Sequence, residues 1–79
     1  IGDVVKYYPK MKVMALKLSH RDIKKGEEIL IEGEKTFIEE NVSSIHFKGK
    51  EIEKGIKGSE VGVKINGKVK KGDKVFLYK

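Results

Sequence analysis

A five-residue motif that occurs twice constrains the fold of this chain more than any other feature. The first copy opens residues 23–33, IKKGEEILIEG, and the second opens residues 69–77, VKKGDKVFL. In both copies an aliphatic residue, two lysines, a glycine and an acidic residue precede alternating aliphatic positions. Because glycine adopts positive φ without steric cost, the motif indicates a sharp turn that leads into a strand. Two such turns in one short chain favour a small β-barrel.

The aliphatic residues indicate an all-β protein. The chain has nine Ile and eight Val, but only four Leu and one Ala. Ile and Val lose side-chain freedom in a helix and pack well on the pleated surface of a sheet. Nine glycines divide the chain into short segments, which suits a closed barrel better than an open sheet. We therefore expect a six-stranded antiparallel closed barrel without helices.

The six strands follow from alternating apolar positions bounded by turn residues. They are expected at residues 4–8, 13–18, 29–32, 36–47, 60–66 and 74–78. Within the first strand, Val5 and Tyr7 should share one face, opposite Val4, Lys6 and Tyr8. Further residues expected to point inward are Met14, Leu16, Leu18, Ile23, Ile52, Ile56, Val61, Val63 and Ile65. Turns are expected at Pro9-Lys10, Lys48-Gly49-Lys50 and Asn66-Gly67.

The fourth predicted strand changes phase partway along its length. Ile38 and Val42 occupy even positions, whereas Ile45 and Phe47 occupy odd ones. One regular strand cannot keep both pairs on one face, because a single-residue step moves every side chain across the sheet. We expect a β-bulge near Ser43-Ser44, which would restore the register and bend the sheet toward closure.

The length of 79 residues fits a single domain, residues 1–79, close to the lower limit for one unaided core. The chain begins with Ile1 rather than Met, so we expect it to be a piece of a longer protein. It has no cysteine, which excludes a disulfide framework and a thiolate zinc site. No apolar run approaches the ~18 residues of a membrane span, and no signal peptide is visible. We expect a cytoplasmic protein without membrane contact.

The net charge leaves two interpretations open. Seventeen Lys and one Arg against 12 acidic residues give a formal net charge of +6, which would attract phosphate backbones. The acidic residues are interleaved with the lysines, however, and a charged fraction of 38% also suits the solvated outer face of a small β domain. Exposed aromatic rings could stack on bases, or the same rings could cover the core: Tyr7, Tyr8, Phe47, Phe76 and Tyr78.

No arrangement of residues indicates catalysis or metal binding. His20 and His46 are the only imidazoles, and neither has a carboxylate at the spacing of a metal pair. Ser44 and His46 could share a strand face, but a nucleophile also needs an orienting acid, so bulge residues are the better interpretation of the two serines. No G-x-x-x-x-G-K-[ST] phosphate loop is present. We therefore expect a domain that is not an enzyme and that binds no cofactor, metal or nucleotide.

Several segments together resemble the translation-factor β-barrel, the second domain of elongation factor Tu. They are IKKGEEILIEG at 23–33, VSSIHF at 42–47, KGIKGSEVGVKI at 54–65 and VKKGDKVF at 69–76. In that family a glycine-acid turn opens a central strand, and a G-x-x-V-G element, here residues 58–62, precedes the strand that closes the core. The opening residues 1–12, IGDVVKYYPKMK, are most similar to a smaller branch. That branch comprises short elongation-factor-like proteins and the C-terminal barrel of collagenase-like peptidases.

The resemblance implies a non-catalytic accessory module that contacts tRNA or ribosomal RNA. The lysines at predicted strand ends are the candidate RNA-binding residues: Lys10, Lys12, Lys24, Lys25, Lys48, Lys50, Lys68, Lys70 and Lys71. Of these, Lys24, Lys25, Lys70 and Lys71 are the strongest candidates. The alternative is a structural or interaction barrel at the C-terminus of a collagenase-like peptidase or RNA-modifying enzyme, where it would pack on a partner domain through an exposed apolar patch. An independent hydrolase is the least favoured hypothesis.

Overall fold

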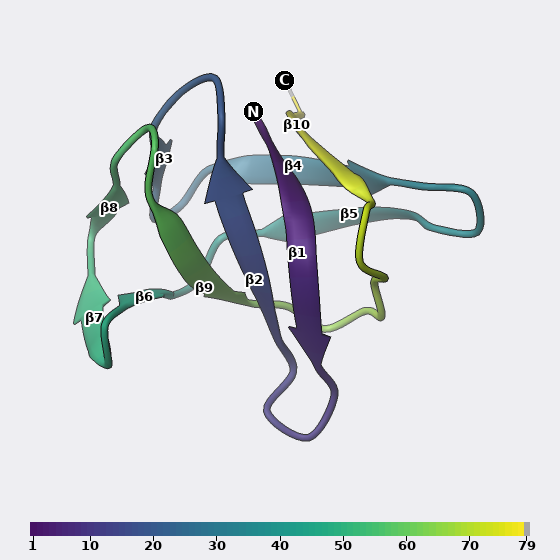
Figure 1. The fold of residues 1–79 in the computed structure, drawn as a ribbon, viewed down its shortest axis with the longest axis horizontal. Coiled ribbons are helices and arrows are strands. Elements are labelled where there is room, and N and C mark those ends of the chain that lie inside the picture. The colour runs from purple at the N-terminus through teal and green to yellow at the C-terminus, as the bar shows by residue number, and fades with distance from the viewer. Residues whose placement is uncertain (79) are drawn as a thin grey trace.

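The computed structural model describes residues 1–78 and confirms the all-β prediction (Figure 1). Ten strands form two sheets, and no helix occurs in the described residues. The main sheet has the antiparallel order β5-β4-β10-β1-β2-β9-β6-β7, and β3 pairs with β8 alone. The strands are β1 Gly2–Tyr8, β2 Val13–Leu18, β3 Ile23–Lys24, β4 Glu28–Glu32, β5 Phe37–Asn41, β6 Ile45–Phe47, β7 Lys50–Ile52, β8 Lys54–Gly55, β9 Glu60–Lys64 and β10 Lys74–Leu77.

The main sheet is a curled eight-stranded half-barrel, so the prediction of a closed six-stranded barrel is wrong (Figure 1). The difference arises in residues 36–47, which the sequence predicts as one bulged strand. In the structure β5 ends at Asn41 and pairs with β4, whereas β6 begins at Ile45 and pairs with β9 and β7. β5 therefore lies at one end of the strand order and β6 next to the other end, which is β7, and no ladder joins β5 to β6 or β7 within residues 1–78. The phase change marks a corner rather than a bulge.

The two copies of the motif fold into the same turn, as predicted. Gly26 and Gly72 have φ of +94° and +96° at the third position. The four-residue turns are 24–27 and 70–73. In the first, the N–H of Glu27 donates to the carbonyl of Lys24 at 3.3 Å, and in the second the N–H of Asp73 donates to the carbonyl of Lys70 at 3.1 Å. This is the geometry of a type II turn, which requires positive φ at that position. In each turn the acidic side chain also accepts from the N–H of the first lysine: Glu27 from Lys24 at 2.7 Å and Asp73 from Lys70 at 2.8 Å.

Each turn also holds one buried valine through a pair of backbone hydrogen bonds. Val42 accepts from Gly26 at 2.8 Å and donates to the carbonyl of Glu27 at 2.9 Å. Val4 accepts from Gly72 and donates to the carbonyl of Asp73, both at 2.8 Å. The strands that follow the turns, β4 and β10, pair antiparallel. The four strands β5-β4-β10-β1 thus consist of two similar halves, each with one motif turn clamped on a valine.

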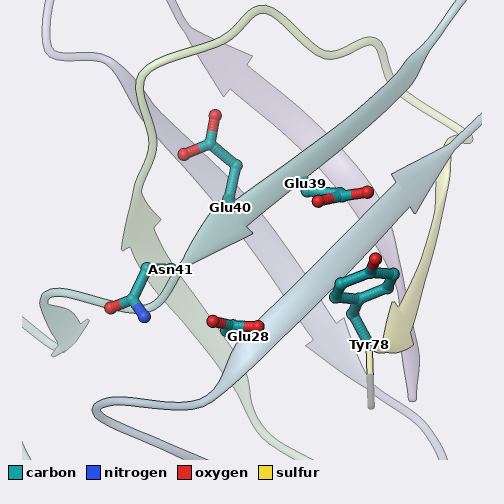
Figure 2. A pocket seen from close by; sticks show the side chains of 5 residues that line it. All are labelled: Glu28, Glu39, Glu40, Asn41 and Tyr78. Atoms are coloured by element: carbon teal, nitrogen blue, oxygen red, sulfur yellow. The ribbon is translucent and has the colours of Figure 1, made fainter.

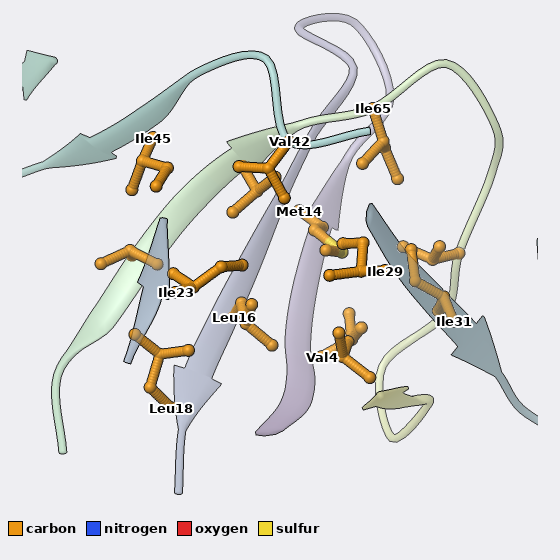
Figure 3. Close-up of a cluster of buried hydrophobic side chains, with 14 residues drawn as sticks. Val4, Met14, Leu16, Leu18, Ile23, Ile29, Ile31, Val42, Ile45 and Ile65 are labelled. Carbon is orange, nitrogen blue, oxygen red and sulfur yellow. The ribbon is translucent and has the colours of Figure 1, made fainter. Parts of the chain in front are cut away.

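A cluster of buried aliphatic side chains fills the half-barrel (Figure 3). Most inward positions predicted from the sequence are confirmed, because period-2 alternation holds along β4 and β9, and along β2 except that Ala15 is also buried. Ile52 packs against the cluster at partial burial. Ile56 is 57% exposed, so its predicted inward position is wrong. The fully or nearly buried members are Val4, Met14, Leu16, Leu18, Ile23, Ile29, Ile31, Val42, Ile45, Val61, Val63, Ile65, Val69 and Val75.

The predicted faces of the first strand are also wrong, because β1 contains the register irregularity. Val4 pairs with Leu16, but Lys6 pairs with Ala15, so Val5 is the extra residue. A bulge of this kind moves the following side chains to the other face. Consequently Val4 is buried in the core, and Tyr7 packs against the same cluster from the far side of the bulge.

The chain changes direction at all three predicted turns, although the third lacks the expected backbone geometry. β1 ends at Tyr8, just before Pro9, and Lys48 and Gly49 both have positive φ in the tight β6–β7 hairpin. The chain bends at Asn66-Gly67, as predicted, but neither residue has the positive φ expected there, and the strands on either side, β9 and β10, do not pair. The backbone N–H groups of these two residues instead donate to the Glu40 carboxylate, at 3.2 and 2.8 Å.

Candidate interaction surfaces

The structure brings together five of the nine lysines predicted to bind RNA. The motif turns lie at opposite ends of the antiparallel β4–β10 ladder, in which Lys74 pairs with Glu32 and Leu77 pairs with Ile29. The lysines of the first turn are therefore separated from those of the second. The second turn lies beside the β1–β2 hairpin instead. We call the resulting group, together with a neighbouring lysine from β1, the lysine end: Lys6, Lys10, Lys12, Lys68, Lys70 and Lys71.

Hydrogen bonds assemble the lysine end from three segments. The second motif turn is clamped on Val4, as described above, which places Lys70 and Lys71 beside β1. The Tyr7 hydroxyl donates to the carbonyl of Gly67 at 3.2 Å, which holds the residues next to Lys68 against the same strand. The N–H of Ile65 donates to the carbonyl of Lys12 at 2.9 Å, which ties the hairpin to the end of β9.

A shallow groove of about 610 Å³ runs through the lysine end. Its walls combine apolar side chains with three ammonium groups, and one of these, on Lys6, lies 5.0 Å from the centre of the Tyr8 ring. Tyr8 is 38% exposed at the hairpin tip, so its ring is available for stacking. The groove is lined by Val5, Lys6, Tyr7, Pro9, Val69, Lys70 and Lys71.

The charges at the lysine end are not neutralised within the described residues. No ion pair among residues 1–78 includes a lysine of this end. The five ion pairs in those residues are Arg21–Glu27, Lys25–Glu51, Lys25–Glu53, Lys54–Asp22 and Lys74–Asp3. Two acidic side chains that contact these segments, Asp73 and Glu40, accept hydrogen bonds from their backbone N–H groups. The lysine end is therefore a positive surface that would favour an anion.

The other four predicted lysines have different surroundings. Lys25 donates a 2.8 Å hydrogen bond to Glu51 and lies 3.6 Å from Glu53. The hydrogen bond between Lys25 and Glu51 raises the pKa of Lys25 and lowers the pKa of Glu51. Lys24 belongs to the same turn, and Lys48 and Lys50 belong to the β6–β7 hairpin. The Lys48 ammonium lies 5.4 Å from the centre of the Phe47 ring. These four lysines do not extend the lysine end.

A second surface lies on the outer side of β5, β4 and β10. Inward residues of these strands fill the core, so the alternate residues face out. Phe37, Phe76 and Tyr78 are 69%, 44% and 42% exposed there, and half-buried Leu30 pairs with Phe76 between them. We call these four residues the aromatic face. Phe76 and Tyr78 are candidate stacking residues from the sequence alone, but the face itself has no local sequence signal, because its assembly depends on the pairing order of three strands.

Carboxylates surround the aromatic face. Glu39 pairs with Leu30, and Glu32 pairs with both Phe37 and Lys74. Glu28 and Glu39 line a hollow of about 220 Å³ together with Glu40, Asn41 and Tyr78 (Figure 2). Figure 2 shows Glu28, Glu39 and the Tyr78 ring on one side of the β4–β5 pair, with Glu40 directed to the other. None of Glu28, Glu32 and Glu39 forms an ion pair with another described residue.

The residues considered for catalysis do not form a site in the described part of the chain. His20 and His46 are exposed, and His46 faces outward from β6, as predicted. The Ser44 Oγ is buried and has no hydrogen-bond partner among residues 1–78, so it is not activated by His46. No group of three potential metal-ligating side chains occurs in the described residues. No helix in the same residues is long and apolar enough to cross a membrane.

Comparison with known proteins gives relatives of one kind. No protein-family model matches the chain. The chain is 45% identical over 80 residues to an uncharacterized protease of Methanocaldococcus jannaschii, in a match that covers 100% of this chain and 19% of that protein. It is 27% identical to a collagenase of Porphyromonas gingivalis, over 99% of this chain and 22% of that protein. The chain thus spans about a fifth of the length of the curated relatives that it matches.

A solved structure shares the fold. The C-terminal domain of a putative U32 peptidase from Geobacillus thermoleovorans superposes with a TM-score of 0.90 at 15% identity, over 99% of this chain and 90% of that chain. These matches support the resemblance to the C-terminal barrel of collagenase-like peptidases. They give no support to the elongation factor Tu assignment.

Proposed function

We propose that this chain is a non-catalytic accessory domain of a larger protein of the collagenase-like, U32 peptidase kind. The observation that carries the proposal is the match at 45% identity, which runs along this whole chain but covers only 19% of the relative. The side chains agree with an accessory role, since the hydroxyl hydrogen bonds in residues 1–78, from Tyr7 and Ser59, go to backbone carbonyls rather than to a histidine or carboxylate, and Ser44 has none. The domain would bind and position, while the chemistry of the larger protein would belong to the rest of its chain.

The test begins with the reading frame that encodes this chain. It should encode at least one further domain, and the full-length protein should be compared with a version that lacks residues 1–79. We expect the isolated domain to leave generic peptides and gelatin uncleaved. We also expect Ser44→Ala and His46→Ala to leave the activity of the full-length protein unchanged. A reading frame without room for another domain, or peptide cleavage by the isolated domain that Ser44→Ala abolishes, would overturn the proposal.

RNA binding at the lysine end is a second candidate function, with tRNA or ribosomal RNA as the ligand. The observation that favours it is a row of ammonium groups without carboxylate partners, set beside the exposed Tyr8 ring. Phosphate contacts with lysine release counterions, so such binding weakens as salt rises. Bases stack on exposed aromatic rings with little dependence on sequence.

The two motif turns provide a matched pair of variants for this candidate. Lys70→Ala/Lys71→Ala alters the lysine end, and Lys24→Ala/Lys25→Ala makes the same change in the same type of turn away from it. Affinity for bulk tRNA, measured by fluorescence anisotropy across a salt series, should fall for the first variant. Its slope of log K against log salt should shrink by about 1.4–1.8, for two lost phosphate contacts in single-stranded or paired RNA. Equal effects of the two variants, or no effect of either, would exclude the lysine end as the RNA site.

A further inference from the structure

We propose that the aromatic face packs against the part of the larger protein that precedes this domain, and that the docked surface is apolar with a basic rim. The proposal rests on the accessory role proposed above and adds to it the surface and the chemistry of the partner. Three features of the domain support it: the apolar residues of the face, its position beside the start of the chain, and the unpaired carboxylates around it.

The apolar residues break the pattern expected of a free sheet face. An antiparallel sheet with one solvated side normally alternates apolar residues inward with polar residues outward. Here three of the six large hydrophobic side chains exposed by residues 1–78 are Phe37, Phe76 and Tyr78, all on the outer side of β5, β4 and β10. Leu30 joins them, because it pairs directly with Phe76 across the β4–β10 ladder. Several large apolar side chains exposed on one sheet face mark an interaction surface more often than single scattered ones do.

The start of the chain lies beside this face. The backbone nitrogen of Ile1 donates to the carbonyl of Val75 at 2.6 Å, and Gly2 pairs with Val75 in the β1–β10 ladder. Phe76 follows Val75 and points outward. In a larger protein with this domain at its C-terminus, the preceding chain would therefore reach the barrel next to the aromatic face. About four-fifths of the length of the matched relatives lies outside the region aligned with this domain.

The carboxylates define the charge of the partner surface. Glu28, Glu32 and Glu39 surround the aromatic face and form no ion pair among residues 1–78. Lys74 lies opposite Glu32 in the β4–β10 ladder, but its ammonium pairs with Asp3. This is an acidic rim in a chain whose net charge is +6. Interfaces commonly combine an apolar centre with a polar rim of complementary charge. The docked surface should therefore present Lys or Arg side chains around an apolar patch, and the lysine end should remain outside the contact.

Cysteine accessibility tests the proposal directly, because this chain has no cysteine of its own. Phe76→Cys and Phe37→Cys place a thiol on the aromatic face. Ile56→Cys is the matched control, since Ile56 is an exposed apolar residue elsewhere, at 57% exposure. Each variant is made in the full-length protein and in the isolated domain, and maleimide labelling of that one cysteine is followed by peptide mass spectrometry. Circular dichroism and thermal denaturation confirm that each isolated variant is folded.

We expect the two aromatic-face thiols to react about tenfold or more slowly in the full-length protein than in the isolated domain, because interface cores exclude solvent. The Ile56→Cys thiol should react at one rate in both. Adding Glu39→Lys to Phe76→Cys should restore fast labelling in the full-length protein, since like charges would then oppose each other across the contact. If the Phe76→Cys thiol is still labelled slowly in the full-length protein after Glu39→Lys is added, the proposal that the docked surface has a basic rim would be overturned.

Other outcomes separate this inference from the accessory role. Equal labelling of all three sites in both proteins would overturn docking through the aromatic face while leaving the accessory role standing. Protection of Ile56→Cys alone would do the same and would assign the contact to another surface. Slow labelling of the aromatic-face thiols in the isolated domain, together with a concentration-dependent dimer in sedimentation, would identify a second copy of this domain as the occupant. A reading frame that encodes no further domain would overturn the accessory role itself.

Discussion

Replacing Gly26 or Gly72 with L-alanine isolates the backbone strain of the motif turns. Both glycines have φ near +95°, and a Cβ added at either would meet no heavy atom within 4 Å. The cost of the substitution is therefore conformational rather than steric. The N–H of each residue would keep its hydrogen bond to Val42 or Val4. D-alanine at the same position favours positive φ and serves as the control, which chemical synthesis of a chain of 79 residues permits.

The magnitude follows from the geometry of the turns. An L-residue held at positive φ costs about 1–2 kcal/mol relative to its preferred region. L- and D-alanine restrict the unfolded chain equally, so the difference between the two variants reports the native-state strain alone. For a domain of this size, each kcal/mol shifts the midpoint of thermal unfolding by about 4–8 °C. We expect each L variant to unfold at least about 4 °C below its D counterpart.

Urea denaturation followed by circular dichroism measures the two free energies of unfolding at constant slope. The effects of Gly26→Ala and Gly72→Ala should add within about 0.5 kcal/mol, because the turns lie at opposite ends of the β4–β10 ladder and share no hydrogen-bond partner. Equal stabilities of the L and D variants would refute the assignment of strain to these turns. A large effect at one turn only would refute the equivalence of the two copies.

Three further predictions concern single side chains. The backbone N–H of Lys57 donates to Asp22 at 2.6 Å and holds the pKa of Asp22 below its ordinary value of 3.8. This stabilisation is present above the unfolded-state pKa and is lost as pH falls through the folded-state pKa. The free energy of unfolding should therefore fall below about pH 4, and the fall should be smaller in Asp22→Asn, as an acid titration followed by circular dichroism would measure. Gly2→Ala should lose about 1–3 kcal/mol in urea unfolding, because a Cβ there would overlap the carbonyl oxygen of Lys17. Lys48→Asn should gain about 0.5 kcal/mol in the same assay, because Lys48 has a φ of +52° in a two-residue hairpin turn, where Asn is favoured.

The local features of the fold could be predicted from the sequence, because short-range backbone preferences control them. The glycine-acid turns at Gly26 and Gly72 depend on residues no more than three apart, and their geometry is confirmed. The inward positions of Met14, Leu16 and Leu18 follow from the period of a strand, and they are fully buried. Where a bulge interrupts that period, as at Val5, the same pattern predicts the wrong face for its neighbours.

The candidate surfaces could be predicted only as lists of exposed residue types. The lysines of both motif turns have the same local sequence and therefore look equivalent in one dimension. In the structure Lys70 and Lys71 lie beside the β1–β2 hairpin, while Lys25 forms ion pairs with Glu51 and Glu53. The difference arises from the antiparallel pairing of β4 with β10, which sends the two turns to opposite ends of one ladder.

The sequence by itself determined the strand class, the two sharp turns and most of the core, since each depends on the conformational preferences of neighbouring residues. Tertiary structure decided which strands pair with the segments before and after the phase change between Val42 and Ile45. The first motif turn clamps Val42, so the chain turns a corner there, and β5 and β6 belong to opposite halves of the strand order. The same long-range pairing gathers Phe37, Leu30 and Phe76 on one face. Strand order depends on contacts between residues far apart in the chain, and local sequence patterns do not specify those contacts.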